Sequence, residues 1–559
     1  MTEYRLNNKF NDAFKQAAFG VSIGENNQLA EFAKALRSGS QMAEVDLASL
    51  YGFTGNGASA EKLGKTEREA LGNLAKVSDA DLSIHAPWSI NFSGINPESG
   101  QKDPQYQALM KNEMKAAIGF ADDVSKSMGR RNMPIIFHAA SDNFGNPDTS
   151  TKIIAYDSEA QKVVPIPTRI NMTKDAFRQV YGEEEFNKIA EGLKTTEDGK
   201  MLILSPDAAM ETHKNDERRQ LVQQQSNLGI QKRNLEMQKI QIARDLAEAS
   251  LQGETAEIAR LSKDKSTFDE QIKDLETSTR FLDFQVSNID KKYVKFNEIA
   301  PNLAAEGVRD AAIMSAKSLT KPMVLVENTM RPDMSLSKPA DVARTVEQAR
   351  RLFVEAAIKD PKLELSRGDA EELSKEIIGV NLDVGHLNLF KSYGKTNRDI
   401  INMLTETGKL DDQTRVSIAD YVKRYHLNDN MGNTDAHLPL GEGTTPVKEI
   451  FETLKNAGVE APAIMEVFGG LGGLDAGQVQ SLEYMGAPLF GDTPYKSLPA
   501  YAGVPYSSII GDYANYSQLG LRNDFLAYGG FTGLSPILGG GYMENNKGGG
   551  GGFSGAPMV

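Results

Sequence analysis

The sequence predicts an α/β fold, a closed (β/α)8 barrel of the TIM-barrel type. Eight short apolar segments recur along the chain, and amphipathic segments lie between them, with apolar residues every three or four positions. Alternating strands and helices in this number are typical of a parallel barrel. The chain has 559 residues, of which 40% are hydrophobic, so it can bury a sizeable core.

The eight predicted strands fall into two groups of four. The first group lies within 1–140 and comprises GVSIG (20–24), MAEVDLA (42–48), DLSIHA (81–86) and MPIIFHAA (133–140). The second lies within 301–475 and comprises MVLVENT (323–329), IGVNLDVGH (378–386), VKRYHLND (422–429) and APAIMEVF (461–468). We expect each group to form one half of the same barrel.

An insertion is predicted at 141–300, because the chain between the fourth and fifth strands is far longer than a crossover needs. Its first part, 150–206, contains KIIAYDSEAQKVVPIP (152–167), which has the pattern of a β-hairpin with a polar turn. A further short strand is expected in KMLILSP (200–206). The insertion therefore begins with a small β region.

Its second part, 208–298, is predicted to be an antiparallel coiled-coil hairpin that reverses at LQGET (251–255). Apolar residues recur at heptad spacing in both arms: Leu221, Leu228, Leu235 and Ile242, then Ile258, Leu261, Phe268, Ile272, Leu275, Leu282, Val286, Ile289 and Tyr293. Mixed Lys and Glu faces favour a spacer or self-association arm over a DNA-gripping or partner-docking one. Both alternatives remain open.

Composition limits the class of protein. There are no cysteines, so disulfides, thiolate metal sites and cysteine nucleophiles are excluded. The net charge of −14 argues against broad attraction to nucleic acid or membranes. A polar N-terminus and the absence of a long apolar run predict a cytoplasmic location without membrane contact. Residues 476–559 form a Gly- and Tyr-rich extension, whose tail 539–559 is expected to be disordered.

Nine metal-binding side chains stand at or just beyond the ends of the predicted strands: His85, His138, Glu327, Asp383, His386, His426, Asp435, His437 and Glu466. The ends of parallel barrel strands meet at one rim, so these side chains are expected to converge. Imidazole and carboxylate donors suit zinc or manganese, and nine donors exceed what one ion needs. The sixth histidine, His213, lies in the insertion and is expected at the surface.

The motifs that carry these donors are SIHAPWSINFSG (83–94), FHAA (137–140), VLVENT (324–329), LDVGH (382–386), YHLND (425–429), DAHLPLGEG (435–443) and IMEVF (464–468). In this order they resemble the endonuclease IV family, AP endonuclease family 2, within the xylose isomerase-like barrel superfamily. The resemblance covers about 20–140 and 300–475. It implies a hydrolase that binds three Zn²⁺ ions, with Mn²⁺ as an alternative at some sites. Its substrate would be duplex DNA, cut 5′ to abasic sites in base excision repair.

The resemblance also implies a role for each donor. His85, His138 and Glu327 would hold the first ion, and Glu327, Asp383, His426 and Glu466 the second, with Glu327 as the bridge. His386, Asp435 and His437 would hold the third. Glu327 and Glu466 would be the catalytic carboxylates, with Glu466 near the nucleophile.

Substrate contacts are implied for Trp88 and Asn91, and Trp88 stands where the family usually has a tyrosine that enters the DNA stack. The DNA-binding positions depart from the family pattern elsewhere. Ser89 replaces an apolar wedge, Ala436 replaces a basic residue, and SLYGFTGNGAS (49–59) carries no Lys or Arg. Fewer cationic contacts mean weaker phosphate binding.

Two other classes of function remain open. Sugar isomerases and epimerases of the same superfamily use one divalent ion, held by donors that Glu327, Asp383, His426 and Glu466 would supply. Such a site would leave His85, His138, Asp435 and His437 without an ion, which favours the nuclease. The third class is a non-catalytic scaffold whose coiled coil binds a protein partner.

Overall fold

A computed structural model of the chain describes residues 19–23, 27–37, 40, 42–50, 59–140, 152–190, 193–196, 198–467, 477–478, 481 and 484–485. Two compact units are present, and Pro147–Glu298 forms the second of them. The predicted tail 539–559 and most of the extension 476–559 lie outside the described residues. No helix among the described residues is long and apolar enough to cross a membrane.

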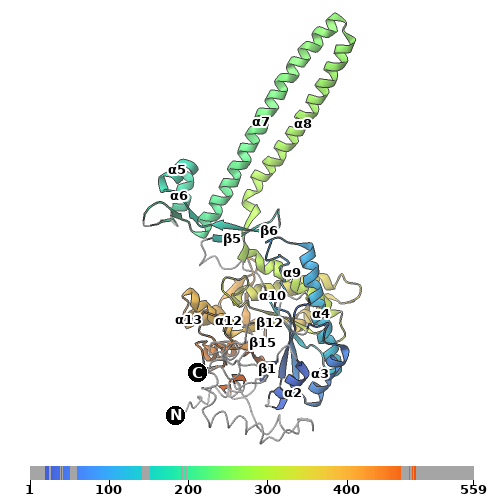
Figure 1. Cartoon of the computed structure of the whole chain (residues 1–559), viewed down its shortest axis with the longest axis vertical. Coiled ribbons are helices and arrows are strands. Elements are labelled where there is room, and N and C mark those ends of the chain that lie inside the picture. The colour runs from blue at the N-terminus through green and yellow to red at the C-terminus, as the bar shows by residue number, and fades with distance from the viewer. Residues whose placement is uncertain are drawn as a thin grey trace, which may run out of the picture. The chain divides into compact units, whose positions relative to one another are not determined.

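Eight parallel strands close the barrel of the first unit (Figure 1). They are β1 (Phe19–Ile23), β2 (Met42–Asp46), β3 (Asp81–His85), β4 (Pro134–His138), β11 (Met323–Glu327), β12 (Ile378–Asp383), β15 (Val422–Leu427) and β16 (Ala463–Met465). Pairing follows this order around the barrel, and β16 pairs with β1 to close it. Each strand falls on a segment predicted as a strand, so the (β/α)8 prediction is confirmed.

Helices lie between the strands in sequence and bury their apolar faces. They are α2 (Gln28–Arg37), α3 (Lys65–Val77), α4 (Pro104–Met128), α9 (Phe296–Ala316), α10 (Pro339–Ala357), α11 (Arg367–Ile377), α12 (Val384–Asn388), α13 (Asn397–Thr405) and α14 (Val447–Asn456). In α10, the buried residues Val342, Val346, Ala349 and Phe353 recur every three or four positions. This spacing forms one apolar stripe on the helix.

Short elements separate β12 from β15. A 3-10 helix (Leu389–Tyr393) follows α12, then β13 (Thr407–Lys409) and β14 (Arg415–Ser417) form a small antiparallel pair, and a second 3-10 helix covers Ile418–Asp420.

Side chains along each barrel strand alternate between the interior and the surrounding helices. In β15, the Tyr425 ring packs against the Phe451 ring of α14, with ring centroids 4.6 Å apart. The neighbouring side chains Arg424 and His426 are buried and contact Glu44 of β2 from inside the barrel. Charged residues therefore occupy part of the barrel interior.

Strands and two short helices begin the insertion. At the position of the predicted hairpin, β5 (Lys152–Asp157) and β6 (Lys162–Pro167) pair antiparallel, and β10 (Tyr293–Lys295) adds a third strand beside β5. A second sheet consists of β7 (Arg169–Ile170), β9 (Leu202–Ile203) and β8 (Lys194–Thr195). The sequence reading did not anticipate β10 or the helices α5 (Lys174–Tyr181) and α6 (Glu183–Ile189).

The long helices α7 (Pro206–Gln252) and α8 (Thr255–Lys292) lie side by side (Figure 1). Gly253 ends α7 with φ 75°, a left-handed conformation that glycine adopts without strain, within the predicted reversal. The second arm ends at Lys292 and not at 298, because the next three residues pair with β5. Tyr293 is therefore a strand residue whose hydroxyl donates to Glu217 at 2.5 Å.

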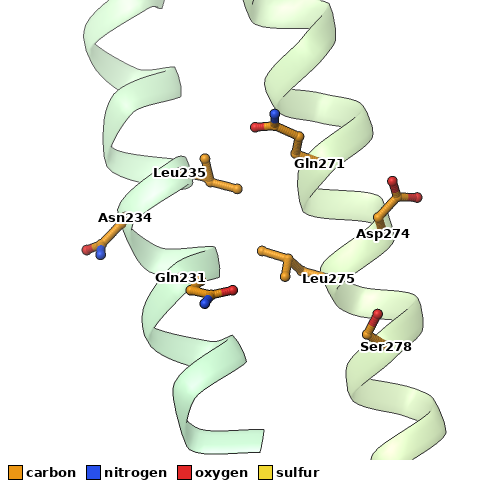
Figure 2. A pocket seen from close by; sticks show the side chains of 7 residues that line it. All are labelled: Gln231, Asn234, Leu235, Gln271, Asp274, Leu275 and Ser278. Atoms are coloured by element: carbon orange, nitrogen blue, oxygen red, sulfur yellow. The ribbon is translucent and has the colours of Figure 1, made fainter. Parts of the chain in front are cut away.

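A groove of about 510 Å³ opens between α7 and α8 in the middle of the pair (Figure 2). Leu235 and Leu275 point toward one another there, with Gln231 and Gln271 beside them. Nearer the sheets, Leu221, Leu282 and Ile289 join the buried core of the insertion. The heptad residues thus pack closely at the base of the pair but leave an open groove further along it.

Candidate metal centre

The nine predicted donors gather at the C-terminal ends of the barrel strands. His85, His138, Glu327 and Asp383 are the last residues of β3, β4, β11 and β12, while His426 is next to last in β15. Glu466 follows β16, His386 lies in α12, and Asp435 and His437 lie in the loop after β15. Glu327, Asp383 and His426 are fully buried.

Within this set, three groups match the three ligand sets implied by the resemblance to the endonuclease IV family. In each group, ligand atoms lie within 4.8 Å of one another: His85, His138 and Glu327; Glu327, Asp383, His426 and Glu466; and His386, Asp435 and His437. A fourth group, His85, His426 and Glu466, links the first two. The fold therefore brings all nine side chains together, with Glu327 shared between two groups.

Glu327 presents its two carboxylate oxygens to different histidines. Its Oε2 lies 3.4 Å from Nε2 of His85 and 3.7 Å from Nε2 of His138. Its Oε1 lies 3.1 Å from Nδ1 of His426. This is the arrangement that a bridging carboxylate requires, since each oxygen faces one group.

Backbone carbonyls orient three of the histidines. Nδ1 of His85 lies 2.9 Å from the Ala86 carbonyl oxygen, Nδ1 of His386 lies 2.8 Å from that of Asn328, and Nδ1 of His437 lies 2.8 Å from that of Glu466. If each Nδ1 carries the proton, Nε2 keeps its lone pair and faces the centre.

Asp383 both begins α12 and faces the centre. Its Oδ1 accepts the His386 backbone N–H at 2.8 Å, which makes it the N-cap of the helix. Its Oδ2 accepts from the Asn428 side chain at 2.9 Å. The motif LDVGH therefore fixes Asp383 and His386 by one local turn.

The loop after β15 is held by a buried carboxylate at its base. Asp429 accepts backbone N–H groups from Gly441, Gly443 and Thr445 at 2.9–3.0 Å. Its own backbone pairs with Leu438. The residue before Leu438, His437, has a positive φ of 45°, which is uncommon for a residue other than glycine.

Buried carboxylates and histidines of the centre shift one another's pKa values in opposite directions. Burial opposes ionisation of Glu327, but His426, His85 and His138 hold its pKa well below its usual range. Burial also works against the protonated forms of His85 and His437, yet nearby carboxylates raise their pKa values to about 10 and about 9. A divalent cation could replace these protons at the same carboxylates.

The pKa values of His138 and Asp383 shift in the direction opposite to those of the other histidines of the centre and of Glu327. Burial lowers the pKa of His138 to about 4 and raises the pKa of Asp383 to about 7. Neutral imidazole is the form that binds a metal, so His138 is already in its ligand form near neutral pH.

The structure adds residues that the sequence reading missed. Glu44 of β2 is fully buried, and its Oε1 lies 2.8 Å from Nε2 of His426. Ser83 donates to its Oε2 at 2.7 Å, and Arg424 lies 3.9 Å from the same oxygen. Glu44 could have been suspected from the sequence, because it is a charged residue inside the otherwise largely apolar segment MAEVDLA.

The two residues expected to contact substrate differ in exposure. Trp88 is 47% exposed, which leaves its ring accessible. Asn91 is 1% exposed, donates to the Ile95 carbonyl, and accepts from the Ser93 backbone and hydroxyl. Its amide therefore stabilises the 91–95 turn and does not face solvent. Contact between Trp88 and a substrate stays a prediction. Asn91 could contact a substrate only if its side chain left this turn.

His213 is not the plain surface residue that was expected. Its ring is half-buried and packs edge-on against the Tyr293 ring, with centroids 4.7 Å apart. Burial lowers its pKa. The ring therefore belongs to the packing of the insertion and is not part of the nine-donor cluster.

Comparisons with known proteins bear on the barrel. Residues 303–486 match a family model described as xylose isomerase-like TIM barrel. One similar solved structure is titled "Crystal structure of D-tagatose 3-epimerase-like protein", with 13% identity, coverage of 84% of this chain and 96% of that chain, and a TM-score of 0.35. Likeness at this distance carries no argument about activity. No curated protein matches. The family match covers the second half of the barrel, and the closed ring of eight parallel strands is the TIM-barrel fold that its description names.

Proposed function

We propose that this protein is a metal-dependent phosphodiester hydrolase that cleaves duplex DNA on the 5′ side of abasic sites. The observation that carries the proposal is the division of nine donors into three compact groups. A single-metal enzyme would need only Glu327, Asp383, His426 and Glu466. The group of His386, Asp435 and His437 would then have no role.

The buried atoms at the centre fit divalent ions. Nε2 of His85, Oε2 of Glu327, Oδ1 of Asp435 and Oε2 of Glu466 are buried and form no well-aligned hydrogen bond. Such atoms are costly to bury unless they are satisfied, and ions at the three groups would satisfy them. His and carboxylate donors without thiolates suit zinc or manganese. When bound, clustered divalent ions lower the pKa of water and stabilise charge on the oxygens of a phosphodiester.

The protein's own side chains divide the remaining work. Glu327 holds the first two groups together through its two oxygens. Glu466 lies with Oε2 3.1 Å from Nδ1 of His426, and its backbone carbonyl orients His437. It therefore contacts both the second group and the third. The exposed ring of Trp88 offers a surface on which a base or an opened duplex step could stack.

A sugar isomerase or epimerase is the second candidate. The group of Glu327, Asp383, His426 and Glu466 is compact and is the most deeply buried of the four. It could hold one ion without the others. Proton transfer next to a sugar carbonyl would then use carboxylates of the same group.

Metal analysis combined with a cleavage assay tests the proposal. Metal content of the purified full chain is expected to be close to three ions. The metal-loaded protein should nick a duplex that carries a synthetic abasic site, and Glu327→Gln should abolish the nick. Glu306→Gln is the matched control, since Glu306 pairs with Lys102 at the surface at 3.2 Å; this variant should retain activity.

Each other outcome has a distinct meaning. One ion per chain with an intact duplex overturns the nuclease in favour of the isomerase. Three ions with an intact duplex overturn it in favour of a scaffold that retains the metal centre.

A further inference from the structure

The five histidines of the metal centre are not oriented alike. Three of them direct Nδ1 to a backbone carbonyl and turn Nε2 to the centre. His426 is reversed, because its Nδ1 faces the centre, 3.1 Å from both Glu327 and Glu466. Its Nε2 points into the barrel and lies 2.8 Å from Oε1 of Glu44.

Glu44 is held by one hydrogen bond and has a buried cation nearby. The Ser83 hydroxyl donates to Oε2 at 2.7 Å, and the buried guanidinium of Arg424 lies 3.9 Å from the same oxygen. The side chains of Glu44, Arg424 and His426 are all within 3% of full burial. Burying the charged side chains of Glu44 and Arg424 inside the barrel costs free energy, and their described contacts do not contribute to strand pairing.

We infer that Glu44 is a positioning residue for the metal centre: it holds the proton of His426 on Nε2, so that Nδ1 presents its lone pair to the ion shared with Glu327, Asp383 and Glu466. Carboxylates commonly perform this task for metal-binding histidines, fixing ring orientation and raising ligand basicity. The inference rests on the metal-binding part of the proposed function. It adds a residue that touches neither ion nor substrate.

Geometry supports a proton on Nε2. A neutral imidazole carries one N–H. Nε2 of His426 and Oε1 of Glu44 lie 2.8 Å apart without a well-aligned hydrogen bond, and a carboxylate oxygen can only accept, so this close approach favours the proton on Nε2. Nδ1 is placed between two carboxylates that belong to the ligand group. A proton there would compete with the ion, whereas a proton on Nε2 would not. Glu44 thus acts on the tautomer of His426 and on its direction.

The test compares metal affinity in the full-length protein and two variants. Glu44→Gln removes the carboxylate charge, and the double variant Glu44→Gln/Arg424→Met also removes the buried cation that would lose its partner. Zinc is titrated against a competing chelator, and total metal is measured after equilibration. One of the three ions is expected to bind about 10–100-fold more weakly in both variants. The other two should stay within about threefold of their original affinity.

Wild-type-like binding of all ions by both variants overturns the inference. Equal weakening of every ion also overturns it, because that result indicates a general structural role. If the wild-type protein itself binds no metal, the proposed function fails as well. If the wild-type protein binds its ions and the variants bind all of them equally well, the role of Glu44 fails while metal binding by the protein stands.

A spectroscopic measurement on the unmodified sequence avoids any folding defect of the variants. In zinc-loaded protein with ¹⁵N-labelled histidine, His426 is expected to show a protonated Nε2 and a metal-shifted Nδ1. Its resonances are assigned by their loss in His426→Gln. The reverse tautomer in the wild-type protein, with the proton on Nδ1, overturns the inference.

Discussion

Gly385 packs tightly beside the candidate metal centre, and Gly385→Ala should disturb that centre. This glycine lies between Asp383 and His386 in the first turn of α12. An added Cβ would lie 1.7 Å from Oδ1 of Asn428 and 2.6 Å from its Cγ. The Asn428 side chain would have to move, and its hydrogen bond to Oδ2 of Asp383 would break.

The expected loss of stability follows from three contributions. Overpacking a tight site costs about 1–3 kcal/mol. A lost hydrogen bond to a charged group costs about 1.5–3 kcal/mol. Alanine in place of glycine within a helix returns about 1 kcal/mol. We therefore expect the free energy of unfolding of the barrel to fall by about 1.5–5 kcal/mol. The second metal group should weaken with it, because Asp383 loses a restraint.

Urea unfolding followed by tryptophan fluorescence measures this effect in the barrel alone, since Trp88 is the chain's single tryptophan. Gly379→Ala is the matched control from the preceding strand, β12. Its Cβ would meet the flexible side chain of Lys423, which can move aside. We expect that control to change unfolding by less than about 1 kcal/mol. Equal stability and metal content in the two variants would refute the reasoning.

Three further predictions concern other parts of the protein. Burial acts to raise the pKa of Asp122, but contacts with Lys126 and Thr320 hold this pKa below its usual range. The ionised carboxylate therefore stabilises the fold at neutral pH, and this stabilisation is lost as the pH falls below about 4. Asp122→Asn should therefore lower the urea midpoint more at pH 7 than at pH 3, and an equal change at both values would contradict this. Phe177→Ala, in the buried core of the insertion, should destabilise that unit by about 3–5 kcal/mol. Hydrogen exchange should detect this loss while the stability of the barrel, followed by Trp88 fluorescence, changes by no more than about 1 kcal/mol. A loss of barrel stability as large as that of the insertion would count against separate units. Chelation of metal should lower the melting temperature of the barrel, because buried carboxylates such as Glu327 lose their cations; an unchanged melting temperature on EDTA treatment would argue against a bound metal.

Much of the barrel and the placement of its donors could be predicted because both follow from local rules. A short apolar strand forms from its own residues, and parallel strand ends meet at one rim whatever the loops between them do. His85, His138 and Glu327 therefore met as expected, although Glu327 lies far from the other two in sequence. Family resemblance then supplied the grouping of ligands.

What escaped prediction depends on contacts between distant segments. The role of Glu44 rests on which face of β2 turns inward and on which side chain of β15 lies opposite, and neither is encoded locally. Asn91 is engaged by its own turn, which a motif does not reveal. Tyr293 follows the heptad spacing of α8, but pairing with β5 overrides the helical pattern.

The pairing of β5 with β10 also bears on how the barrel can assemble. Strands β4 and β11 are neighbours in the barrel, yet the polypeptide between them runs from 139 to 322. Once Asp157 lies opposite Tyr293, that connection shrinks to the pieces 139–156 and 294–322, roughly a quarter of its length. The entropic cost, in free energy, of bringing β4 and β11 together therefore falls by about 1 kcal/mol. If β5 and β10 pair early in folding, β4 and β11 would be joined by a much shorter effective connection, and the two halves of the barrel could pair with little extra cost from the insertion.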